Sequence, residues 1–163
     1  MNIILIGMSG AGKSTLGVLL AKTLGLDFVD TDIVIQQAQG RLLQEIIDTD
    51  GIEEFIKIEE KAVTGLKLKN SVVATGGSVV YSQSAMNFLK ANGRVIYLHV
   101  PYEEIEDRLQ NISGRGSVIK EGKSLKGVYD ERVPLYKKYS DITVDCTGKD
   151  IEQCVREILK NKR

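Results

Sequence analysis

The feature that most constrains this chain is a glycine-rich segment close to its start. Residues 7–14 read Gly-Met-Ser-Gly-Ala-Gly-Lys-Ser, which matches the pattern G-x-x-x-x-G-K-[ST] at every fixed position. An apolar, β-branched run precedes this segment, and residues 14–24 follow it with helical periodicity. In a strand, loop and helix of this kind, backbone N–H groups and the helix N-terminus bind the phosphates of a nucleotide. We therefore expect a phosphate loop here rather than a plain glycine-rich turn.

The residues of this loop have separate expected roles. Lys13 should reach the β- and γ-phosphates of a nucleotide, and the Ser14 hydroxyl is the expected ligand of Mg²⁺. The residues expected to bind nucleotide are Gly7, Gly10, Ala11, Gly12, Lys13, Ser14, Thr15 and Arg108.

Length and charge narrow the class of protein. A chain of 163 residues suits one domain, with helices on both faces of a sheet. Lys plus Arg and Asp plus Glu both total 22, so net charge gives no reason to expect nucleic acid or an anionic membrane as a partner. No apolar stretch approaches the length of a transmembrane segment, and the short first run leads directly into the loop. We expect a cytoplasmic monomer that acts on a small molecule, with no membrane anchor.

Strand-like and helical patterns alternate along the chain. The strand-like runs are 2–6, 27–29, 71–74, 94–100 and 142–144. The helical patterns after the first helix are 42–47, 52–59, 82–92, 102–110, 125–139 and 151–160. This alternation predicts an α/β fold, a three-layer sandwich around a mainly parallel sheet of about five strands.

Three polar segments should meet at the carboxyl edge of that sheet, where such folds bind ligands. The phosphate loop is the first, and Asp30-Thr31-Asp32 is the second, offering one carboxylate to a metal and another to a hydroxyl. The alternative for this pair is capping of a helix that starts near Ile33. The third segment contains Gly76 and Gly77, whose backbone N–H groups can touch a substrate, although a plain turn would also use them.

The order of these motifs resembles that of the shikimate kinases, from Met1 to about Asp145. The matching pieces are the phosphate loop, residues 28–32, the helix 51–59, residues 74–78, Arg115 and the segment 130–136 around Arg-Val-Pro-Leu-Tyr. The resemblance implies the P-loop kinase fold and transfer of a phosphoryl group from ATP to a hydroxyl of shikimate. We expect one domain, 1–163, with a phosphate loop at 7–14, a substrate-binding helical segment at about 31–69 and a mobile lid at about 111–122.

The resemblance also implies a role for individual residues. Asp30 would help to place Mg²⁺, and Asp32 would hold and deprotonate the acceptor hydroxyl. Gly76 and Gly77 would touch the substrate, and Arg132 would pair with its carboxylate. The catalytic set is therefore expected to be Lys13, Asp32 and Arg115, the last covering the transferred phosphate from the lid.

Four departures from the family pattern leave the acceptor open. Ile56 stands where the family has an arginine that helps grip the carboxylate, and Ile52 and Ser78 replace a glutamate and a glycine. Gly116 follows Arg115 where a proline is usual. Lys57 should point about 100° away around the helix and cannot supply the bidentate fork of a guanidinium. We expect a hydroxylated and carboxylated small molecule as substrate, with shikimate preferred and a sugar acid or neutral polyol as the alternative acceptor. A non-catalytic nucleotide-binding module is the alternative from another class.

Overall fold

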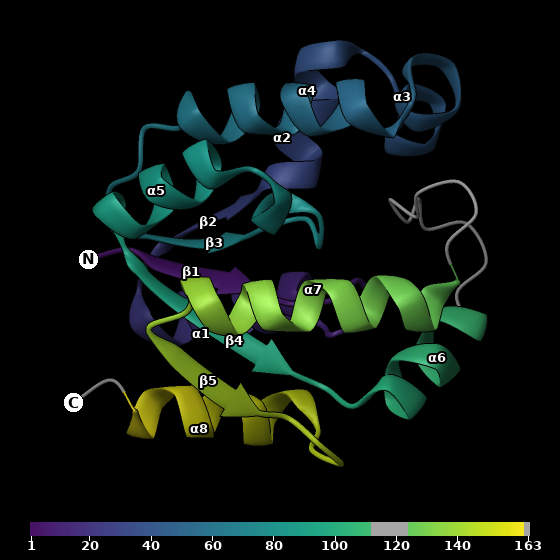
Figure 1. Ribbon diagram of the computed structural model, residues 1–163. Coiled ribbons are helices and arrows are strands. Elements are labelled where there is room, and N and C mark those ends of the chain that lie inside the picture. Colours follow the sequence, from purple (N-terminus) through teal and green to yellow (C-terminus); the bar gives the residue numbers. More distant parts are fainter. Residues whose placement is uncertain (112–123, 162–163) are drawn as a thin grey trace.

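A parallel five-stranded sheet forms the centre of the computed structural model, which describes residues 1–111 and 124–161 (Figure 1). The strands lie in the order β2-β3-β1-β4-β5. Their bounds are β1 Ile3–Ile6, β2 Asp27–Asp30, β3 Ser71–Ala74, β4 Arg94–His99 and β5 Ile142–Asp145. The helices are α1 Lys13–Leu24, α2 Thr31–Gln39, α3 Leu43–Asp50, α4 Ile52–Thr64, α5 Gln83–Asn92, α6 Tyr102–Gln110, α7 Leu125–Tyr139 and α8 Ile151–Lys160, with a 3₁₀ turn, η1, at Val79–Tyr81.

Burial explains why these runs form strands of a parallel sheet. All residues of β1 and β3 are buried, whereas the edge strands β2 and β5 are partly exposed. Strand β1 pairs on both sides, with Ile4 opposite Val73 of β3 and Val95 of β4. Helices α5 and α7 lie in front of the sheet in Figure 1 and α1 lies behind it. The predicted three-layer α/β architecture with five parallel strands is confirmed. The prediction succeeds because strands buried on both faces of a parallel sheet appear in the sequence as short, continuous apolar runs.

The described residues form two hydrophobic core clusters. The larger cluster surrounds the sheet, and the smaller one centres on Ile35, Ile46 and Phe55, which are buried between α2, α3 and α4. Figure 1 shows these three helices together above the β2 edge of the sheet. The helices of the expected substrate-binding segment therefore share a small core of their own.

Several element boundaries differ from the predicted ones. Helix α4 continues five residues beyond the predicted end at Glu59, because Ala62 and Val63 extend its apolar face, and it ends before Gly65. Helix α3 likewise runs on to Asp50. The sequence analysis missed η1, a short turn that the 3.6-residue pattern does not detect. Arg115 and nearly all of the expected lid lie outside the described residues. None of the described helices is long and apolar enough to span a bilayer.

Candidate active site

The phosphate loop joins β1 to α1 with the backbone that its glycines permit. Gly12 caps α1 at a φ of 87°, in the left-handed region that favours glycine. Lys13 is the first residue of the helix and is buried, and its Nζ donates hydrogen bonds of 2.7 Å to the carbonyl oxygens of Gly7 and Met8. The lysine ammonium is thus held across the loop, beside the N-terminus of α1 where an anion is stabilised.

Asp30 links the phosphate loop to the start of α2. Its Oδ2 accepts a 2.7 Å hydrogen bond from the Ser14 hydroxyl, while its Oδ1 accepts one of 3.0 Å from the backbone N–H of Asp32. The second bond is an N-cap, so the capping alternative is confirmed for Asp30. The same carboxylate brings a second hard oxygen beside Ser14, and the two roles use different oxygens.

Gly76 stands where no side chain fits. Its N–H donates to the buried Thr31 hydroxyl at 3.2 Å. A Cβ on this residue would stand 2.6 Å from Glu59 Oε2 and 3.0 Å from Asp32 Oδ1. The carboxyl groups of Glu59 on α4 and Asp32 on α2 therefore flank the same glycine, and they fit there because glycine has no side chain.

Arg132 of α7 reaches the same place from the other side of the cleft. Its side chain is buried, at 1% exposure, and Nε donates to the Tyr81 hydroxyl at 3.3 Å. A Cβ on Gly77 would lie 2.9 Å from Nη1 of this arginine, so the second glycine is also required by close approach. The Tyr136 hydroxyl donates to the Gly77 carbonyl at 2.6 Å and fixes the glycine turn against α7.

Glu59 is a site residue that the sequence analysis did not single out. It is 1% exposed, and its Oε1 accepts a 2.7 Å hydrogen bond from the Ser78 hydroxyl. The pKa of this carboxyl is raised to about 7, chiefly by burial and also by the charge of Asp32, while the Ser78 hydrogen bond and the charges of Arg132 and Lys13 limit the rise. A sequence signal existed, since Glu59 follows Phe55 at helical spacing on an otherwise buried face.

These groups line one continuous depression at the carboxyl edge of the sheet. A cleft of about 450 Å³ runs along the phosphate loop past Asp30, Asp32 and Gly76. Beyond it lies a hollow of about 20 Å³, room for about one water molecule, lined by Ser9, Asp32, Leu43, Phe55, Gly76, Gly77, Ser78 and Arg132. The hollow therefore admits no more than one small group of a molecule that occupies the larger cleft.

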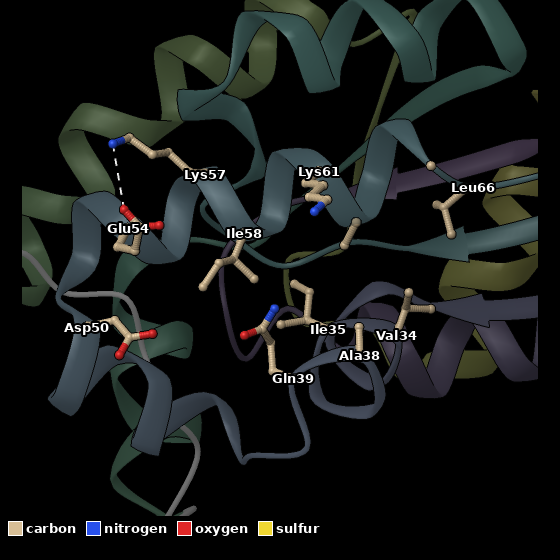
Figure 2. Close-up of a pocket in the computed structure, with 12 residues that line it drawn as sticks. Val34, Ile35, Ala38, Gln39, Asp50, Glu54, Lys57, Ile58, Lys61 and Leu66 are labelled. Carbon is tan, nitrogen blue, oxygen red and sulfur yellow. Dashed lines mark ion pairs between the residues drawn. The ribbon is translucent and has the colours of Figure 1, made fainter.

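A larger cavity, of about 680 Å³, lies between α2 and α4 (Figure 2) and shares no lining residue with the cleft. Lys57 lines this cavity and pairs with Glu54 at 3.6 Å, which Figure 2 marks with a dashed line. The lysine next to Ile56 thus faces a different cavity from the phosphate-loop cleft, as helix geometry predicts.

The structure brings together most of the residues selected from the sequence. Lys13, Ser14, Asp30, Asp32, Gly76 and Gly77 line the cleft, and Arg132 closes its far end. Arg108 of α6 reaches the phosphate loop and donates from Nη1 to the Gly10 carbonyl at 3.0 Å. The arrangement offers a cationic cradle for phosphates, an oxygen pair for a hard cation, and a carboxylate beside a polar pocket.

Comparison with known proteins agrees with this geometry. A family model described as shikimate kinase matches residues 9–162. The shikimate kinase of Caldanaerobacter subterraneus subsp. tengcongensis is 36% identical over 98% of this chain and 94% of its own length. That of Thermodesulfovibrio yellowstonii is 37% identical over 98% and 93%. A solved shikimate kinase from Acinetobacter baumannii in complex with shikimate has a TM-score of 0.88 at 30% identity, covering 99% of this chain and 94% of that one.

Proposed function

The chain belongs to the shikimate kinase family and is an ATP-dependent phosphotransferase acting on a hydroxyl group, and on that premise we propose that its acceptor is shikimate. The observation that carries the proposal is the convergence of Asp32 of α2, Gly76 of the loop after β3 and Arg132 of α7 at the end of the phosphate cleft. A carboxylated acceptor held by Arg132 would present a hydroxyl to Asp32 on the side of the phosphate loop.

In this proposal each side chain has one task. Lys13 neutralises the charge that develops on the transferred phosphoryl group, and the loop backbone holds the phosphates in line. Asp32 orients the acceptor hydroxyl and accepts its proton. Arg132 binds the acceptor carboxylate through charge-assisted hydrogen bonds. Gly76 and Gly77 let the acceptor approach the backbone closely, although the Gly76 N–H itself is bonded to the Thr31 hydroxyl. Arg115 and Arg108 remain the predicted contacts to the phosphates and nucleotide.

The residues present suit Mg²⁺, although they would not cage it. Ser14 Oγ and Asp30 Oδ2 lie 2.7 Å apart and are both hard oxygen donors. Within residues 1–111 and 124–161, no group of three or more His, Cys, Asp or Glu is placed to hold a metal ion. Magnesium characteristically keeps water and phosphate oxygens in its shell, so two protein oxygens are sufficient. When bound, the ion supplies charge neutralisation at the phosphates.

A coupled assay of ADP release tests the acceptor assignment. We expect turnover with shikimate and little with quinate, gluconate or neutral polyols. Asp32→Asn keeps the shape of the side chain and should lower kcat by roughly a hundredfold or more, with ATP affinity little changed. Turnover only with another hydroxyl compound would refute shikimate as acceptor, and the absence of any acceptor-stimulated turnover would refute the phosphotransferase.

A further inference from the structure

One carboxyl oxygen of Glu59 is left without a hydrogen-bond partner directly behind Gly76 and Ser78, two residues that line the small hollow near Arg132. Glu59 Oε1 accepts the Ser78 hydroxyl, but Oε2 is buried and receives no donor from the residues that the structure describes. Oε2 is the oxygen that faces Gly76, opposite Asp32. A buried, ionised oxygen without a donor is costly, and a proton on this oxygen removes its negative charge.

The charges around this carboxyl come from three other elements. Asp32 on α2 opposes the ionised form of Glu59, whereas Arg132 on α7 and Lys13 on α1 favour it. Ile56, one turn earlier on α4, contributes no charge. The two expected magnesium ligands bond to each other, since the Ser14 hydroxyl donates to Asp30. The hydrogen bond that Glu59 accepts comes from Ser78 instead.

We propose that Glu59 takes up a proton from solvent on Oε2 when a carboxylated acceptor binds beside Arg132, so that binding of the acceptor is coupled to protonation. The inference rests on the proposed function, because it requires an anionic acceptor in this cleft.

The coupling follows from the number of negative groups that would lie near Arg132 once an acceptor is bound. An acceptor carboxylate engages Arg132 and so withdraws the cation that favours ionised Glu59. Asp32, Glu59 and the acceptor would then be three negative groups near one buried guanidinium, and Glu59 relieves the repulsion by protonating. Coupling is reciprocal, so the acceptor binds more tightly to the protonated form. The pKa of about 7 places this change near neutral pH, and affinity falls as pH rises through that value.

Calorimetry can measure the proton directly. Shikimate is titrated into the full chain at pH 7 without nucleotide, in two buffers that differ in protonation enthalpy. We expect uptake of about half a proton for each shikimate bound, and affinity that weakens about tenfold between pH 6.5 and 8.5. Glu59→Gln should bind shikimate with no proton uptake and with little pH dependence. The matched control is Glu53→Gln, which alters an exposed carboxyl on the same helix and should behave like wild type.

Ser78→Gly gives a second and independent test. Because the Ser78 hydroxyl favours the ionised carboxyl, its removal should move the midpoint of the affinity change to higher pH. Wild-type binding without proton uptake, uptake that persists in Glu59→Gln, or an unmoved midpoint in Ser78→Gly would each overturn the coupling. Those results leave the proposed function intact if shikimate still stimulates ADP release. Absence of shikimate binding at every pH would overturn the proposed function, and this inference with it.

Discussion

Ile56 is the residue at which this chain departs most in chemistry from the family pattern. It is half-buried on α4, one turn before Glu59, and leaves Arg132 as the arginine closing the hollow among the described residues. Ser78, another of the four departures, donates a hydrogen bond to Glu59. Ile56 and Ser78, which are far apart in the sequence, therefore both lie near the Glu59 carboxyl. This carboxyl receives a neutral hydrogen-bond donor from Ser78 and no positive charge from position 56.

Restoring an arginine at position 56 should strengthen acceptor binding. Ile56→Arg is expected to lower KM for shikimate about tenfold, since a charge-assisted hydrogen bond contributes roughly 1.5 to 3 kcal/mol before rotamer entropy and desolvation are subtracted. The new guanidinium would also favour ionised Glu59 and weaken the pH dependence of KM. Steady-state kinetics between pH 6 and 9 measure both effects, with Ile56→Leu as the uncharged control. An unchanged KM would mean that residue 56 does not reach the acceptor.

At the scale of elements, the turn between α5 and β4 depends on a glycine for space. Gly93 has extended backbone, but a Cβ there would collide with Ile4 Cδ1 and stand 2.9 Å from the Asn2 carbonyl. That carbonyl accepts the Arg94 N–H at 3.0 Å where β4 begins to pair with β1. Gly93→Ala should therefore cost about 1 to 3 kcal/mol of unfolding free energy, as overpacking usually does.

Urea unfolding followed by circular dichroism measures this loss. Gly127→Ala is the matched control, because this glycine lies in the first turn of α7 and an added Cβ meets nothing nearer than the Ser124 hydroxyl at 3.4 Å. The control should be neutral or gain up to about 1 kcal/mol from helix propensity. A Gly93→Ala protein as stable as wild type would show that the β1–β4 junction relaxes freely.

Elements were easier to predict from the sequence than the complete site. The strands are short apolar runs between helices, and the phosphate loop is a local motif, so both are encoded by neighbouring residues. Glu59 could be assigned to a helix but not to its buried position behind the cleft, because its environment is built by Gly76, Ser78 and Arg132, which are far away in the chain. The roles assigned to individual site residues, Arg115 included, remain predictions.

For the whole molecule, the cleft and its hollow are lined both by the helical segment that carries the small hydrophobic cluster and by α7, which packs on the sheet. Phe55 belongs to the small cluster between α2, α3 and α4, and it also lines the acceptor hollow. Arg132 belongs to α7, which packs on the sheet and carries residues of the larger cluster. An acceptor held by Asp32 and Arg132 would therefore join the helical segment 31–69 to the sheet.

This position predicts where bound acceptor changes local stability. Without ligand, backbone amides of α2, α3 and α4 should exchange with solvent faster than those of β1, β3 and β4, because a three-residue core resists local opening less than the central one. Saturating shikimate should slow exchange in the three helices by about tenfold or more, since it binds the closed form. Hydrogen exchange with mass spectrometry, in the presence and absence of shikimate, measures this effect for each segment.

Helix α8, on the far β5 edge, is the internal control and should change little. Equal slowing in α8 and in α2 to α4 would indicate general stabilisation instead, and would contradict an acceptor that joins the two clusters.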